Sequence, residues 1–212
     1  MPVPLGVAAS SAPPGYNQGY SDQLYKLLRG SATQLQLVKL GCGGETTTTF
    51  VSGEICRYDG LAQFDEAIAF VRAHRDAMSL ITVDLGANDV IECIFALDRR
   101  CFDAGLAVVE ANLPPLLDAL HDAAGDGTLL VGMTYYDVFV GTPAKAMVDE
   151  FNAALEEIYA ASDVPVADVA GAFAANPSAT CSWTWWCSKY GDIHANTAGY
   201  GVIASAFADL VS

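Results

Sequence analysis

The sequence is poor in basic residues: ten Lys and Arg stand against 25 Asp and Glu, which gives a net charge of −15 at pH 7. Because contact with phosphates requires clustered Lys and Arg, this balance argues against a nucleic-acid partner. Long hydrophobic runs are absent too, and none reaches the roughly 20 residues of a membrane-spanning helix. The first residues, MPVPLGVAAS, lack the basic stretch and the long apolar stretch of a signal peptide.

No internal repeat, linker or low-complexity segment divides the chain of 212 residues. Hydrophobic residues make up 52% and charged residues 17%, a balance typical of globular proteins. A chain of this length and composition can bury one full core. We therefore expect a single domain over residues 1–212.

Cysteine is present in an even number, and the six residues form three pairs of sequence neighbours. These pairs are Cys42 with Cys56, Cys93 with Cys101, and Cys181 with Cys187. Six cysteines allow many connectivities, but turn-like residues between close neighbours favour the three local disulfides. The C-x-x-C spacing typical of zinc sites does not occur, so we expect no metal. Disulfides need an oxidising compartment, which predicts a secreted protein whose export signal is missing from the front of this chain.

The hydrophobic pattern alternates between strands and helices. Short apolar runs rich in β-branched residues predict buried strands, and apolar residues at helical spacing predict amphipathic helices. The expected strands cover residues 35–40, 78–85, 128–135 and 164–170, and the expected helices cover 19–30, 64–77, about 104–124, 143–160 and 197–211. This order predicts an α/β fold with a parallel sheet covered on both faces. Pro114 and Pro115 are expected to kink or restart the third helix.

Three polar segments follow these strands, at the edge where parallel α/β sheets bind ligands. GCGGETTTT (41–49) contains glycines whose backbone N–H groups can approach an anion, or which form a tight turn beside a disulfide. GAND (86–89) contains Asn88, which either donates to a developing oxyanion or ends the strand in an Asx turn. The third segment is TYYDVFVG (134–141).

His194, in the stretch GDIHANTAGY, is the candidate general base. Imidazole titrates near neutral pH, and Asp192 and Asn196 stand beside it in the sequence. His74 and His121 lie within helical patterns and are interpreted as surface or core residues. Glycine amides, an Asn amide and a histidine at the strand ends of one sheet make an acyl-transfer site that lacks only its nucleophile.

LGCGGETTTT, DLGAND and DIHANTAGY resemble the second, third and fifth sequence blocks of the SGNH (GDSL-type) hydrolases, in particular secreted actinobacterial-type esterases and lipases. That group also carries paired cysteines and a YYDPF-like segment. The resemblance implies a three-layer, flavodoxin-like α/β fold. It also implies hydrolysis of small-molecule or lipid esters through an acyl-serine intermediate, without metal or cofactor. On this pattern Gly44 gives a backbone N–H and Asn88 a side-chain N–H to the oxyanion hole, and His194 is the base.

The histidine block departs from the family pattern at one position. The family acid lies three residues before the histidine, where this chain has Gly191, and Asp192 comes one residue later. A one-residue shift can turn a side chain away from the imidazole. Either Asp192 or a backbone carbonyl near Gly191 is therefore expected to hold the Nδ1 proton.

The nucleophile is the second departure. In the family a Gly-Asp-Ser motif ends the first strand; with Gly6 in the family's glycine position, the missing serine falls on Pro2 and the missing aspartate on Met1. We therefore expect an N-terminally truncated chain that lacks its central first strand and is impaired in activity. Such a sheet closes over the gap or borrows a strand, which predicts a monomer or a strand-exchanged dimer.

Other serines near the N-terminus are not expected to replace the nucleophile. They are Ser10 and Ser11, in the loop after the lost motif, and Ser21, which opens the first helix. None of them follows a strand in a turn that would expose its hydroxyl beside Gly44 and Asn88.

A non-catalytic protein of the same fold, binding a glycan or a lipid, is the alternative. CSWTWWCS (181–188) supports it, because Trp183, Trp185 and Trp186 in a disulfide loop resemble a stacking platform. In an extended segment Trp183 and Trp185 face the same side. In an enzyme they line a possible substrate pocket, unless they pack onto the core.

Overall fold

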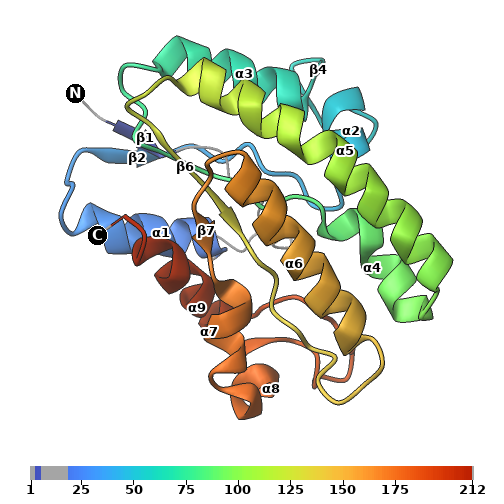
Figure 1. Cartoon of the computed structure of the whole chain (residues 1–212). Coiled ribbons are helices and arrows are strands. Elements are labelled where there is room, and N and C mark those ends of the chain that lie inside the picture. Colours follow the sequence, from blue (N-terminus) through green and yellow to red (C-terminus); the bar gives the residue numbers. More distant parts are fainter. Residues whose placement is uncertain (1–2, 6–18, 212) are drawn as a thin grey trace.

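A parallel sheet of five short strands forms the centre of the computed structural model, which describes residues 3–5 and 19–211 (Figure 1). The strands are β1 (Val3–Leu5), β2 (Leu35–Leu37), β5 (Leu80–Thr82), β6 (Leu129–Met133) and β7 (Val166–Ala167). Their order across the sheet is β2-β1-β5-β6-β7. This is the order of flavodoxin-like folds, in which the ligand crevice lies where the direction of strand succession reverses, next to β1.

The centre of the sheet corrects the expectation of a missing first strand. β1 (Val3–Leu5) lies inside the sheet, between β2 and β5, and pairs in parallel with β2 over its three residues, from Val3 opposite Leu35 to Leu5 opposite Leu37. Its pairing with β5 is recorded at one position, Leu5 opposite Leu80. The physical reason is that an empty centre leaves ladder groups on both neighbours unpaired, at about 1–3 kcal/mol for each buried group. The positions aligned with the missing motif, Met1 and Pro2, lie outside the described residues.

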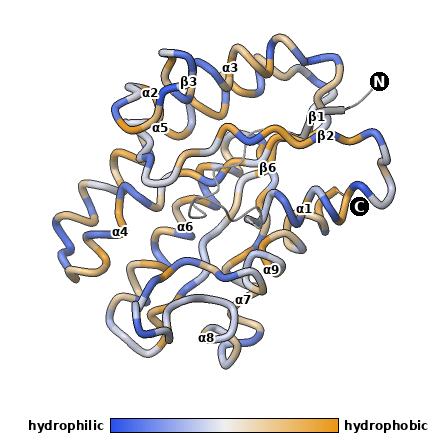
Figure 2. The backbone as a smooth tube through the Cα atoms, turned by 180° about the vertical axis from the view of Figure 1, so that it is seen from behind, coloured by the Kyte–Doolittle hydropathy of each residue, from blue (hydrophilic) through white to orange (hydrophobic). Residues whose placement is uncertain are grey.

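Helices cover both faces of the sheet (Figure 1). On one face lie α3 (Gln63–His74), α5 (Arg99–Ala124) and α6 (Lys145–Ala161); on the other lie α1 (Tyr20–Arg29) and α9 (Thr197–Ala208). Successive strand residues point to opposite faces, so Ile81 packs into the first cluster and Leu80 into the second. Along α1 and α3 hydrophilic and hydrophobic residues alternate at helical spacing, as Figure 2 shows. The predicted three-layer α/β fold is thereby confirmed.

Helix α5 continues through Pro114 and Pro115, where the sequence predicted a kink or a restart. Each proline removes one backbone hydrogen-bond donor from the helix, at a cost of about 3 kcal/mol. Apolar side chains on both sides of the two prolines are buried, among them Leu113, Leu116 and Leu117. Packing along the whole length of the helix therefore outweighs the local loss of hydrogen bonds.

Several short elements were not predicted, and most of them lie in the segments between the long elements. They are α2 (Thr47–Ser52), α4 (Ala87–Ala96), α7 (Val169–Ala174), a 3-10 turn (Pro177–Ala179), α8 (Thr180–Trp183), and a hairpin of β3 (Arg57–Tyr58) and β4 (Leu61–Ala62). Among the described helices, none is both long and apolar enough to cross a membrane.

Gly132 in β6 gives a direct test of this packing. A Cβ placed on Gly132 would meet the ring of Tyr159, which is fully buried on α6. We expect Gly132→Ala to lower the free energy of unfolding by about 1–3 kcal/mol, because an overpacked site must displace a fixed neighbour. Gly127→Ala is the matched control, since nothing lies within 4 Å of a Cβ at that position. Urea denaturation of both variants measures the difference; equal effects would show that the ring does not lie on Gly132.

Candidate active site

The segments that follow β2, β5 and β6 meet the segment that precedes α9 around one cavity. The cavity has a volume of about 200 Å³. Its polar lining includes Gly44, Asp84, Asn88, Tyr135 and His194. The structure therefore brings together the three candidate groups that the sequence singled out, at the carboxyl edge of the sheet.

His194 is held by Asp192. The ring Nδ1 and the Asp192 Oδ1 atom lie 2.5 Å apart, and the His194 backbone N–H donates to the same oxygen at 2.8 Å. The partner of the His194 Nδ1 atom is therefore Asp192 and not a backbone carbonyl. Partial burial works to raise the pKa of Asp192, but the hydrogen bonds from His194 outweigh it, so the pKa lies below its usual value. An ionised Asp192 fixes a proton on Nδ1 and leaves Nε2 as the basic nitrogen.

The backbone around His194 is braced by the disulfide loop that carries the tryptophans. Trp185 N–H donates to the His194 carbonyl at 2.9 Å, and Asn196 N–H donates to the Trp183 carbonyl at 2.9 Å, across an antiparallel bridge. The Asn196 side chain then caps α9 by accepting from Ala198 N–H at 2.9 Å. The loop at residues 181–187 therefore fixes the position of the histidine through its main chain.

The tryptophan side chains themselves are not part of the described cavity lining. Trp183 ends α8 and packs edge-on against Phe173, with ring centroids 5.1 Å apart. Trp185 is 47% exposed, and Trp186 packs against Phe139. Because residues 180–183 are helical, the argument from an extended segment does not apply to this pair. The structure does not bring Trp183 and Trp185 into the substrate pocket suggested for them.

Two hydrogen-bond donors line the cavity opposite the histidine segment. Asn88 uses one N–H of its side-chain amide to donate to the Glu45 carbonyl at 2.9 Å, and an amide carries a second. Gly44 has a φ of +88°, a backbone conformation that favours glycine. Within the described part of the chain, no acceptor is recorded for the Gly44 N–H. Both groups are available to a ligand oxygen.

Asp89 fixes the two loops that carry these donors. Its carboxylate accepts from the Thr47 backbone N–H at 2.9 Å and from the Thr47 hydroxyl at 2.8 Å. Asn112 on α5 donates to the hydroxyls of Thr47 and Thr48, at 3.1 and 3.2 Å. The glycine-rich loop after β2 and the start of α4 therefore form one hydrogen-bonded unit.

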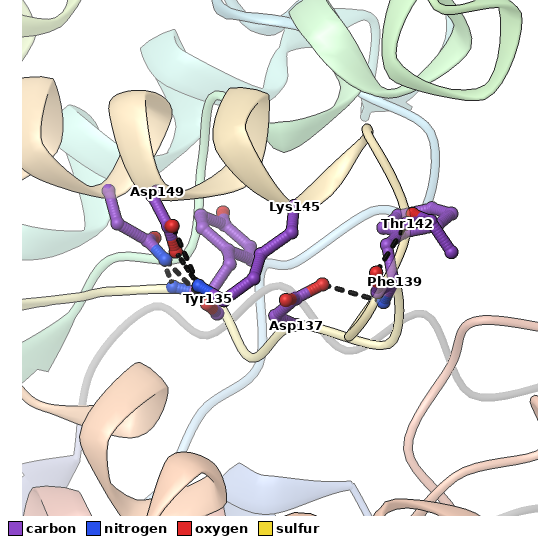
Figure 3. A network of polar contacts seen from close by, with 7 residues as sticks. Tyr135, Asp137, Phe139, Thr142, Lys145 and Asp149 are labelled. Atoms are coloured by element: carbon purple, nitrogen blue, oxygen red, sulfur yellow. Dashed lines mark hydrogen bonds and ion pairs between the residues drawn. The ribbon is translucent and has the colours of Figure 1, made fainter.

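The loop between β6 and α6 forms a further wall, and Figure 3 shows its polar contacts. The Asn152 side chain exchanges two hydrogen bonds with the Tyr135 backbone, both at 2.7 Å. Asp137 turns back to accept from Phe139 N–H at 2.6 Å, and Lys145 pairs with Asp149 in the first turns of α6. The Asn152 bonds fix the Tyr135 backbone, and Tyr135 lines the cavity.

Asp84 is a cavity residue that the sequence analysis missed. It accepts a hydrogen bond from the Tyr135 hydroxyl at 2.5 Å. Burial raises its pKa from 3.8 to about 6, against the opposing effects of the Tyr135 hydrogen bond and of His194. A signal was present in the sequence, since Asp84 is the one charged residue of the apolar run MSLITVDL.

The six cysteines form the three local disulfides that were expected. The Cα–Cα distances are 6.4 Å for Cys42–Cys56, 5.4 Å for Cys93–Cys101 and 5.1 Å for Cys181–Cys187. Cys42 and Cys56 also lie close to Glu45, a grouping that resembles a set of metal ligands. Their sulfurs are bonded to each other and are not free thiolates, so this group does not fit a metal site.

Of the serines considered as nucleophiles, Ser10 and Ser11 lie outside the described residues. Ser21, in the first turn of α1, is 1% exposed, and its buried hydroxyl has no recorded hydrogen-bond partner. It is not among the described residues that line the cavity. The structure therefore does not bring Ser21 to His194.

The substitution Asp84→Asn tests the charge of this residue, because it removes the ionisable group and keeps an acceptor for the Tyr135 hydroxyl. Because the folded state keeps the proton up to about pH 6 and an unfolded carboxyl loses it near pH 4, ionisation of Asp84 costs stability as the pH rises through this window. Asparagine still accepts from Tyr135 but cannot ionise. We expect it to raise the free energy of unfolding by about 1–3 kcal/mol at pH 7.5 and to change it little at pH 4. Urea denaturation at both pH values measures this, and an equal change at both would contradict the assignment.

Solved structures of similar fold include an esterase, a lipase and an α/β hydrolase by their descriptions. An acetylxylan esterase from Geobacillus stearothermophilus has a TM-score of 0.71 and 16% identity, with 100% of this chain and 97% of that chain covered. A lipase from a goat rumen metagenome has a TM-score of 0.70 and 14% identity, with coverage of 98% and 95%. An α/β hydrolase from the metagenome of Lake Arreo has a TM-score of 0.65 and 17% identity, with coverage of 98% and 94%. At these identities the likeness establishes the fold.

Among curated protein sequences none matches this chain. The profile of one protein family does match it, over residues 6–202, and this span contains Gly44, Asn88, Asp192 and His194. The sequence blocks, the strand order and this match agree. The chain belongs to the GDSL-like lipase/acylhydrolase family.

Proposed function

We propose that this protein hydrolyses carboxylic esters, with His194 as general base, Asp192 as its orienting acid, and Gly44 and Asn88 as oxyanion donors. The observation that carries the proposal is the His194–Asp192 pair on the cavity that Gly44 and Asn88 also line. Membership of a family of lipases and acylhydrolases supports ester hydrolysis as the reaction class.

The reaction follows from these groups. His194 Nε2 takes the proton of the attacking hydroxyl while that oxygen bonds to the ester carbonyl carbon, and the carbonyl oxygen becomes an oxyanion. The Gly44 N–H and the free N–H of Asn88 stabilise this charge. The imidazolium, held by Asp192, then gives its proton to the departing alkoxide. The family resemblance implies a serine as the attacking hydroxyl, but the position aligned with that serine is Pro2. In this chain His194 therefore activates a water molecule, whose attack releases the acid and the alcohol directly, and we expect turnover to be impaired relative to an acyl-serine mechanism.

Three disulfides support an oxidising compartment, and we include secretion in the proposal. A monomer and a strand-exchanged dimer both stay predictions. The alternative of a glycan- or lipid-binding protein loses its main support, because Trp183 and Trp185 are not in the described lining of the cavity.

Substitution of the histidine tests the base. His194→Ala is expected to lower kcat/KM for 4-nitrophenyl esters by about 10²–10⁴-fold, because the proton of the nucleophile then has no acceptor. His74→Ala is the matched control, since His74 lies on α3 with its Nδ1 on the Phe70 carbonyl, away from the cavity. Equal activity of the two variants would reject His194 as the base, and absence of turnover in the unsubstituted chain would count against hydrolysis by this chain.

Asn88→Ala tests the oxyanion donor. We expect kcat to fall by about 10²–10³-fold with little change in KM, because the interaction strengthens as the oxyanion forms. Steady-state kinetics give both constants, and a change confined to KM would contradict this role. Labelling with a fluorophosphonate, followed by peptide mass mapping, identifies the nucleophile independently.

A further inference from the structure

The cavity extends well beyond the polar groups used by the proposed reaction. Its deep wall is mainly apolar and comes from four helices: Phe50 of α2, Ala67 of α3, Ile94 of α4, and Leu113, Leu117 and Leu120 of α5. One polar side chain, Gln63 of α3, is buried in the same lining among the described residues, and its Oε1 atom has no recorded hydrogen-bond partner. A polar group placed there would lose its hydrogen bonds to water without replacement. The deep part therefore suits a hydrocarbon chain.

The lining changes from exposed to buried along the cavity. The His194 side chain is 50% exposed, whereas Ala67, Leu113 and Leu117 are fully buried. The cavity thus leads from the surface at the carboxyl edge of the sheet into the core beneath α3 and α5. A linear group that enters with its polar end at Gly44 and Asn88 has its tail among these leucines.

The position of the wall distinguishes the acyl group of an ester from its alcohol group. Phe50 lies on α2, the helix that follows Gly44, and Ile94 lies on α4, which carries Asn88 in its first turn. Part of the apolar wall is therefore built by the same helices that follow or carry the two oxyanion donors. The alcohol leaves from the side of His194, which gives it a proton. The chain that fits the deep wall is the acyl chain.

The volume sets the length of that chain. A protein cavity of about 150 Å³ binds benzene, which has six carbon atoms. On the same ratio, the whole cavity of about 200 Å³ takes roughly eight non-hydrogen atoms, and the ester group at Gly44 and Asn88 occupies part of this space. An acetyl group fills a small part of this space, and a long-chain fatty acyl group exceeds it.

We propose that this site accepts esters of medium-chain carboxylic acids, about six to ten carbons long, with the acyl chain buried between the sheet and helices α3 and α5. This inference rests on the proposed ester hydrolysis and assigns the substrate class of the same site. It differs from the acetyl esters named in the descriptions of similar structures.

Binding of 2-alkanones tests this without requiring turnover, because a ketone carbonyl accepts the same hydrogen bonds as an ester carbonyl and is not hydrolysed. Isothermal titration with chains of about 4 to 14 carbons measures the affinity. We expect an increase of about fourfold per methylene up to about eight to ten carbons, and no further gain beyond. Affinity that does not depend on chain length would overturn the proposal.

Ala67→Met is the variant that fills the cavity, because the Ala67 side chain lines it. The added atoms should shorten the longest chain that still gains affinity by about three carbons. Ala69→Met, on the exposed face of the same helix, is the matched control and should leave the limit unchanged. If Ala67→Met does not fold, as judged by circular dichroism, Ala67→Val should shift the limit by about two carbons. If the chain-length limit does not shift in the folded variant, the hydrocarbon tail binds elsewhere and the assignment is refuted.

The two proposals fail separately. Turnover of 4-nitrophenyl acetate without any dependence of ketone binding on chain length would leave ester hydrolysis standing and reject the medium-chain assignment. Ketone binding limited at eight to ten carbons in a chain that turns over no ester would support the acyl channel and count against hydrolysis by this chain.

Discussion

The carboxylate of Asp89 is the contact on which the geometry of the proposed oxyanion donors depends. It accepts both the backbone N–H and the hydroxyl of Thr47, so it joins the loop after β2 to the helix that follows β5. The hydrogen bond from Asn88 to the Glu45 carbonyl is a second link between the same two segments. Gly44 and Asn88 come from strands that are not neighbours in the sheet. Without these bonds their separation would be set by two independent loops.

The histidine side of the cavity is built on a different principle. There the main chain of the 181–187 loop pairs with the main chain at 194–196, and the carboxylate of Asp192 holds the ring. The donor side, with Gly44 and Asn88, and the histidine side face each other across the cavity at the carboxyl edge of the sheet. Hydrogen bonds fix each half before a ligand arrives, which is the condition for electrostatic stabilisation without reorganisation. Asp84 lies at the same cavity and adds a carboxyl that loses its proton near pH 6.

The long elements and the order of the functional segments were predictable from the sequence, whereas the short elements around the site were not. The apolar runs at 78–85 and 128–135 contain β5 and β6, because a buried parallel strand needs little besides hydrophobic side chains. Asn88 and Asp89 favoured a turn, but tertiary hydrogen bonds to Thr47 and Glu45 make them the first turn of α4. Such bonds join residues more than 40 positions apart and leave no local pattern. The interior strand β1, only three residues long, falls below the length at which periodicity can be read.

The brace behind His194 has a consequence for what its disulfide contributes to the protein. Its loop is closed by Cys181–Cys187, six positions apart, and this covalent closure adds to the packing of Trp183 on Phe173 and of Trp186 on Phe139. The sheet and its two hydrophobic clusters involve neither cysteine. The core of a newly made chain therefore does not depend on this pair, whereas its oxidation adds a covalent restraint to the loop that positions His194.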